Sequence, residues 1–188
     1  PHNYIIKEIP SFFVAPSEIF ALFKDKPYSF FLDSSQFNPD FGRFSFLGFD
    51  PKIILKSKSD TINITEGGKV RTFKGNPFDE IKKILEEHNM RPNFKKSGLP
   101  FLGGAVGYLG YELKNFLEDL PQRSRDDLNL PETTLGFYDT VIISDNLNKK
   151  MYLAGLKTPD TLKKIVSIEN IIRDFKTEKT PLLKEIFN

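Results

Sequence analysis

The chain has 188 residues, which fits one domain with a small extension and is long enough to bury a sizeable core. Its 27 basic and 25 acidic residues give a net charge of +2, which excludes strong attraction to nucleic acid or to an anionic membrane. It has no Cys and only two His, which excludes disulfides, thiolate nucleophiles and Cys-based zinc sites and argues against a His-rich metal site.

The sequence shows no sign of a membrane or secretory segment. No window reaches the roughly 18–20 apolar residues of a membrane span, and the N-terminus lacks the basic-then-apolar form of a signal peptide. We therefore expect a cytoplasmic protein without a membrane partner. The 19 Phe residues and the absence of Trp are unusual, and they favour a core of flat rings between sheet layers.

The N-terminal half consists mainly of predicted strands. Period-two alternation and aromatic or β-branched content predict strands over 4–9, 28–34, 43–49, 52–58, 61–65 and 70–73. Pro16 stands in the first turn of a predicted helix over 17–23, because its missing N–H costs nothing there. Asn76 caps a second helix, which begins at Pro77 and carries His88 in its last turn. A lone His at that position ordinarily complements the helix dipole.

In the stretch 98–121, the apolar run that begins at Phe101 holds four glycines. Glycine weakens a strand interior, so Gly103, Gly104, Gly107 and Gly110 predict a strand that is kinked or closely approached by another element. The spacing does not match a dinucleotide fingerprint, and no Gly-Lys-Ser/Thr follows to form a phosphate-binding loop. A helix is then predicted over 111–120.

The C-terminal third begins with a polar loop over 121–131. Its paired acids, Asp126 and Asp127, suit a solvated surface better than a divalent cation, because nothing supplies the remaining oxygen ligands. The longest strand is predicted over 134–144. Asp139 interrupts it, and such a charge must reach an edge or a partner.

A hairpin and a helix are predicted to follow. Residues 145–148 turn that strand into another over 150–154. Thr158 caps a helix that ends at about Phe175, and the charged tail 176–188 has the pattern of a linker. Consecutive hairpin-compatible strands separated by single helices predict an antiparallel α+β fold with helices on the outer faces of packed sheets. The residues alone form no recognisable catalytic set.

Four ordered blocks carry a family resemblance. FFLDSS, GRFSFLGFDP, PFLGGAVGYLGYEL with LEDLP, and DDLNLPETTLGFYDTVIISDNLNKKMYL resemble the N-terminal region of the anthranilate synthase and aminodeoxychorismate synthase component I family. The resemblance runs from about Tyr28 to Leu153. It implies a layered α/β/β/α arrangement with two antiparallel sheets packed face to face. It also implies that 1–175 form the family's N-terminal domain and that 176–188 lead toward an absent C-terminal chorismate-binding catalytic domain.

The resemblance also implies a function. Component I enzymes bind chorismate and Mg²⁺ and add ammonia delivered by a glutamine amidotransferase subunit. Their chorismate and Mg²⁺ residues lie in the C-terminal half, so we expect this chain to be inactive alone and to hold no cofactor. The short segment before Tyr28 and the wording of 76–94 favour the aminodeoxychorismate branch, which makes para-aminobenzoate for folate. Alternatives are the regulatory portion of anthranilate synthase, in tryptophan biosynthesis, and a free-standing ligand-binding module.

The family's N-terminal portion carries a tryptophan pocket, formed partly by a Leu-Glu-Ser signature and an Arg-Tyr-Ser-Phe segment. The matching residues here are Leu32, Asp33, Ser34, Arg43, Phe44, Ser45 and Phe46. Asp33 replaces the usual Glu and shortens the carboxylate by one methylene, which puts a salt link to a ligand ammonium in doubt. The alternative is that these segments are only core strands. A domain that packs against another half also predicts an exposed apolar patch near Gly103 to Tyr111.

Overall fold

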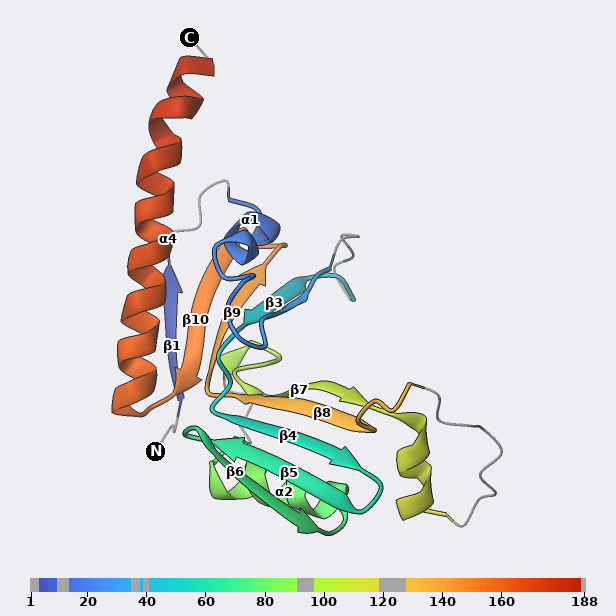
Figure 1. The fold of residues 1–188 in the computed structure, drawn as a ribbon. Helices are drawn as coiled ribbons and strands as arrows, with labels where there is room; N and C mark the ends of the chain where they lie inside the picture. Colours follow the sequence, from blue (N-terminus) through green and yellow to red (C-terminus); the bar gives the residue numbers. More distant parts are fainter. Residues whose placement is uncertain are drawn as a thin grey trace. The chain divides into compact units, whose positions relative to one another are not determined.

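The computed structural model describes residues 4–9, 14–34, 38, 41–90, 97–118 and 128–186, with their side chains up to residue 175. The chain forms two compact units, one of 1–50 with 140–188 and one of 51–139 (Figure 1). Each unit contains one five-stranded antiparallel sheet. The predicted α+β fold with two antiparallel sheets is therefore confirmed, whereas the face-to-face packing and the boundary toward a further domain remain predictions.

The first unit is built on a sheet whose helices lie on one face. Its strands, in spatial order, are β1 (Tyr4–Ile9), β10 (Lys150–Leu156), β9 (Thr140–Asp145), β3 (Phe44–Gly48) and β2 (Phe30–Leu32). The helices are α1 (Pro16–Ala21) and α4 (Pro159–Ile186), and Figure 1 shows α4 running along β1. Lys7 of β1 contacts Glu169 of α4 at 2.5 Å.

The core of the first unit lies between this sheet and its helices. Its buried side chains are Ile9, Ile19, Phe23, Leu47, Phe49, Ile142, Met151, Leu153, Ile165, Ile168 and Ile172. The rings of Phe23 and Phe49 stack with centroids 4.6 Å apart. Successive strand residues point to opposite faces, so Ser45 shares the helix-covered face with Leu47, and Phe44 and Phe46 lie on the other face.

The second unit is a sheet with strand order β6 (Lys69–Lys74), β5 (Thr61–Glu66), β4 (Ile53–Lys58), β8 (Thr133–Tyr138) and β7 (Gly104–Leu109). It also contains α2 (Pro77–Glu87) and a 3₁₀ helix, η1 (Tyr111–Phe116). The Asn76 side chain caps α2 as predicted, because its Oδ1 accepts a hydrogen bond from the Phe78 N–H at 2.9 Å. His88 is the C-terminal cap of α2 and lies 3.9 Å from Glu66.

The glycines of β7 and its end permit a close approach of β8. A Cβ on Gly107, whose φ is +154°, would lie 2.0 Å from the Thr134 carbonyl oxygen. A Cβ on Gly110 would lie 2.7 Å from the Glu132 carbonyl oxygen. No side chain fits at such distances, so the predicted close approach at this glycine-rich strand is confirmed.

Three predicted boundaries are wrong. The helix predicted over 111–120 is a 3₁₀ helix that ends at Phe116. The strand predicted over 134–144 is two strands in different sheets, because the chain leaves β8 at Tyr138 and enters β9 at Thr140, with Asp139 between them. The helix predicted to end at Phe175 continues to Ile186, so most of the expected linker is helical. Asp126 and Asp127 lie outside the described residues.

Two further expectations concern surfaces. Large apolar side chains are exposed near the predicted patch, namely Tyr108, Leu109 and Tyr111, with exposed fractions of 46%, 53% and 79%. Among the helices of the described residues, none is both long and apolar enough to cross a membrane.

Candidate functional site

The structure brings the two predicted pocket segments together. Leu32 pairs with Phe46 where β2 meets β3, so the Leu-Asp-Ser segment at the end of β2 lies beside the Arg-Phe-Ser-Phe segment at the start of β3. Ser34 secures this approach, because its hydroxyl donates to the Phe44 carbonyl oxygen at 2.7 Å. The seven predicted residues therefore form one cluster, although they are separated in sequence.

Ser45 is the buried centre of the cluster, with an exposed fraction of 0%. Its hydroxyl donates to Asp33 Oδ1 at 2.9 Å. It accepts from the Ser34 backbone N–H at 3.1 Å and from Asn146 Nδ2 at 3.0 Å. A serine hydroxyl has one proton and two lone pairs, so all three of its positions are used.

Arg43 is held by a bidentate ion pair that the sequence did not predict. Its Nε and Nη2 donate to the two carboxylate oxygens of Asp145, at 3.1 and 2.6 Å. Asn148 donates to the same two oxygens, from its backbone N–H at 3.1 Å and from Nδ2 at 2.9 Å. The four donors together satisfy a carboxylate with an exposed fraction of only 1%.

The hydrogen bonds between Arg43, Asn148 and Asp145 determine the charge of the ion pair. Burial alone would raise the pKa of Asp145, but the hydrogen bonds from Arg43 and Asn148 outweigh burial and lower the pKa below its ordinary value of 3.8. The hydrogen bond to Asp145 likewise raises the pKa of Arg43. The pair is therefore charged on both sides at neutral pH.

The apolar part of the cluster lies on the sheet face opposite Ser45. Phe44 and Phe46 are two residues apart on β3, with ring centroids 6.3 Å apart, and Leu32 is opposite Phe46 on β2. The Arg43 guanidinium lies 4.6 Å from the Phe44 ring centroid. An aromatic surface with a cation above it suits a flat apolar ligand group. The predicted residues thus divide into an aromatic face and a polar network around Ser45.

Sequence reasoning missed the contribution of the end of β9 and of the turn that follows it. Asp145, Asn146 and Asn148 were interpreted only as turn residues, whereas their side chains hold Arg43 and Ser45. Asn146 also accepts a hydrogen bond from Ser144 at 3.0 Å, and its backbone N–H donates to the Arg43 carbonyl oxygen at 2.8 Å. The one available signal was a run of Asp and Asn directly after a buried strand.

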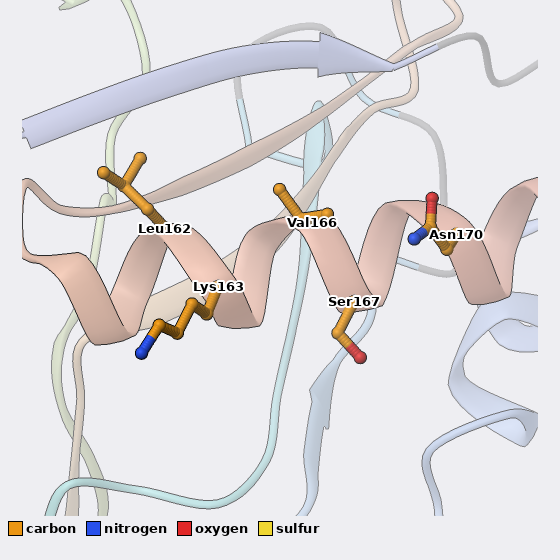
Figure 2. Close-up of a pocket in the computed structure, with 5 residues that line it drawn as sticks. All are labelled: Leu162, Lys163, Val166, Ser167 and Asn170. Carbon is orange, nitrogen blue, oxygen red and sulfur yellow. The ribbon is translucent and has the colours of Figure 1, made fainter.

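A shallow groove of about 510 Å³ lies elsewhere, along α4. It is lined by Leu162, Lys163, Val166, Ser167 and Asn170, which Figure 2 shows on successive turns of this one helix. A groove with a single wall does not enclose a ligand. Within the described part of the chain, no three His, Asp or Glu side chains are grouped to hold a metal ion.

Comparison with known proteins agrees with the resemblance in the sequence. The chain matches the family described as chorismate binding enzyme over residues 30–184. It is 35% identical over 143 residues to anthranilate synthase component 1 of Acetivibrio thermocellus, covering 73% of this chain and 28% of that protein. It is 29% identical to aminodeoxychorismate synthase component 1 of Klebsiella aerogenes, covering 74% of this chain and 31% of that protein.

The fold is shared with a solved structure. Anthranilate synthase component I from Streptococcus pneumoniae TIGR4 superposes with a TM-score of 0.57 at 18% identity, covering 90% of this chain and 37% of that chain. The chain thus spans less than a third of the length of the two relatives named above. Because the family match extends over most of its residues, the chain belongs to the chorismate binding enzyme family.

Proposed function

We propose that this chain is the N-terminal, non-catalytic portion of a component I synthase that aminates chorismate. The observation that carries the proposal is the match of residues 30–184 to the chorismate binding family, together with relatives that are several times longer. In this proposal a C-terminal chorismate-binding domain of the same protein supplies the chemistry, and a glutamine amidotransferase subunit supplies ammonia.

The metal belongs to the same proposal. Mg²⁺ is expected in the C-terminal catalytic domain, and it prefers carboxylate and other oxygen ligands. The described residues of this chain offer no such group of side chains, so we assign no metal-dependent step to them.

The catalytic part of the proposal is tested with the 188-residue chain itself. Incubated with chorismate, ammonium and Mg²⁺, it should form neither anthranilate nor 4-amino-4-deoxychorismate. Conversion of chorismate by the isolated chain would refute the proposal. A chimera in which this chain replaces the matching segment of the Klebsiella aerogenes relative should retain activity. A chimera with a scrambled β2–β3 segment serves as the control.

We further propose that the cluster around β2 and β3 is a tryptophan-type pocket. The Phe44 and Phe46 rings with Leu32 would contact the indole. The amino-acid end of the ligand would reach around the sheet edge to the polar groups that follow the end of the edge strand β2. The exposed carboxylate of Asp33 is the group suited to an ammonium. Calorimetry with tryptophan tests the pocket, and Phe44→Ala should weaken binding because it removes a ring from the contact surface.

The branch of the family is the finer question. We favour aminodeoxychorismate synthase, because the wording of residues 76–94 resembles that branch. Anthranilate synthase is the second candidate, and the 35% identity to the Acetivibrio thermocellus protein favours it. Tryptophan separates them in an active chimera. It should bind without inhibition if the pocket is structural, and it should inhibit if the chain is the regulatory portion of anthranilate synthase. A free-standing ligand-binding module would bind tryptophan but give no active chimera.

A further inference from the structure

The hydrogen bonds of Ser45 have a direction that the geometry fixes. Asp33 is a carboxylate and can only accept, so the single proton of the Ser45 hydroxyl must point to Asp33 Oδ1. The Ser34 backbone N–H can only donate, so it takes one lone pair of the hydroxyl. One lone pair remains, and whatever meets it must be a donor.

Asn146 supplies that donor, and its own orientation is fixed in turn. Its Nδ2 faces Ser45 at 3.0 Å, while its Oδ1 accepts from the Ser144 hydroxyl at 3.0 Å. If the amide were flipped, Asn146 Oδ1 would face the remaining lone pair of the Ser45 hydroxyl and could not donate to it. The Ser45 proton could then turn from Asp33 to Asn146. The order of donors from Asn146 through Ser45 to Asp33 is therefore consistent at every step.

We propose that Asn146 is a positioning residue for Asp33, and that it acts through the hydroxyl proton of Ser45. Asn146 and Asp33 share no hydrogen bond, but each bonds the same oxygen of a buried serine. With the Ser45 proton held on Oδ1, the Asp33 carboxylate has one defined orientation, and Oδ2, which no described residue bonds, is open to a ligand. Asn146 would thereby determine preference for ligands that carry an ammonium. This last step rests on the proposed tryptophan-type pocket, whereas the coupling itself rests only on the hydrogen bonds of the first unit.

The first test needs no ligand. A double-mutant cycle of Asn146→Ala and Asp33→Ala is measured by urea unfolding of the full chain. Each substitution changes the unfolding equilibrium constant by some factor. We expect the factor for the double variant to differ at least fivefold from the product of the factors for the two single variants. Independent sites add to within about twofold, so an additive cycle would overturn the proposal. Asn146→Leu keeps the approximate size of the side chain, adds no charge and cannot donate to Ser45, and it should couple to Asp33 as Asn146→Ala does.

The control cycle pairs Asp33→Ala with Asn148→Ala. Asn148 lies in the same turn as Asn146, but its bonds go to Asp145 and not to Ser45. This cycle should be additive within about twofold. Coupling of equal size in both cycles would mean that the turn acts as a whole, and it would also overturn a specific role for Asn146.

The second test concerns ligand preference. Calorimetry of the full chain compares tryptophan with indole-3-propionate, which has the ring and the carboxylate but no ammonium. Asn146→Ala should weaken tryptophan binding at least fivefold and change indole-3-propionate binding less than twofold, while Asn148→Ala leaves their ratio unchanged. Equal weakening of both ligands by Asn146→Ala would reduce Asn146 to a structural role and refute its part in preference. If the unmodified chain binds neither ligand, the tryptophan-type pocket is refuted, and the ligand-free cycle alone decides the coupling.

Discussion

Two buried serines allow a controlled test of the hydrogen-bond reasoning. Ser45 lies in β3 of the first unit and Ser57 in β4 of the second unit, with exposed fractions of 0% and 1%. The Ser45 hydroxyl has three hydrogen bonds. The Ser57 hydroxyl has none to any described residue, and neither has that of Thr133, which is opposite it on β8. The same Ser→Ala change therefore removes a satisfied hydroxyl in one unit and an unsatisfied one in the other.

The two substitutions should change the free energy of unfolding in opposite directions. Ser45→Ala leaves the Ser34 N–H and the Asn146 amide without an acceptor in a part-buried site, and a buried polar group without a partner costs about 1–3 kcal/mol. Asp33 is exposed and regains water, so we expect a net loss of about 2 kcal/mol. Ser57→Ala removes a hydroxyl that was desolvated without compensation, and we expect a gain of up to about 1 kcal/mol.

Urea unfolding followed by circular dichroism measures both variants. For a unit of this size the slope is about 1–2 kcal/mol per molar urea, so Ser45→Ala should lower the midpoint of the first unit by roughly 1–2 M. Ser57→Ala should leave the second unit unchanged or raise its midpoint. The reasoning is refuted if Ser57→Ala destabilises as much as Ser45→Ala, or if Ser45→Ala stays within about 0.5 kcal/mol of the unmodified chain.

Three other predictions address titration and backbone strain. The lowered pKa of Asp145 means that its carboxylate stabilises the fold above its ordinary pKa of 3.8, and that this stabilisation is lost as the pH falls through the folded-state pKa. The unmodified chain should therefore be more stable than Asp145→Asn at neutral pH. This difference in the free energy of unfolding, measured with urea, should shrink from about pH 5 to about pH 2. Burial raises the pKa of Tyr4 to about 12. The stabilisation from its neutral form is therefore fully present below about pH 10, and it is lost as the pH rises through the folded-state pKa. Phenolate absorbance should show a late-titrating tyrosine whose signal is missing in Tyr4→Phe, and a titration with no such difference would contradict the assignment. Gly107→Ala should destabilise the second unit by at least about 3 kcal/mol, because of strain and a backbone clash, whereas Gly68→Ala, at φ +77° in open space, should cost only about 1 kcal/mol.

Local features of the fold were predictable because their causes are local. Asn76 followed by Pro77 begins a helix through a side-chain cap and a fixed φ, and the structure has this start. Gly67 and Gly68 adopt the positive φ that the tight turn between β5 and β6 requires. Such signals lie within a few residues and depend little on the rest of the chain.

The features that were missed depend on distant partners. The apolar pattern over 134–144 satisfies one long strand as well as two short ones, and only pairing with different sheets divides it at Asp139. The apolar residues of 111–120 fit an α-helix, but the structure has one 3₁₀ segment in which Leu113 alone is buried. Periodicity predicts which side chains share a face, but it does not predict where a helix or strand ends.

The candidate site was likewise predictable only in part. The resemblance predicted that residues 32–34 and 43–46 belong together, and the pairing of β2 with β3 brings them together. The partners on β9 could not be predicted from spacing, because the ion pair of Arg43 with Asp145 joins residues 102 positions apart. A turn sequence rich in Asp and Asn also has an adequate local explanation in its hydrogen bonds to its own backbone.

The continuity of the second unit bears on the order of folding. Residues 51–139 form one uninterrupted segment, whereas the first unit must join β3 to β9 across it. Within the second unit, the Lys52 N–H donates to the Phe137 carbonyl oxygen at 2.8 Å, so its folding brings its two ends together. The loop that β3 and β9 must close then shortens from about a hundred residues to about ten, which lowers the entropic cost of closure by roughly 2 kcal/mol. The inserted segment would thus nucleate the sheet that surrounds it in sequence, and refolding of the first unit should lag behind that of the second.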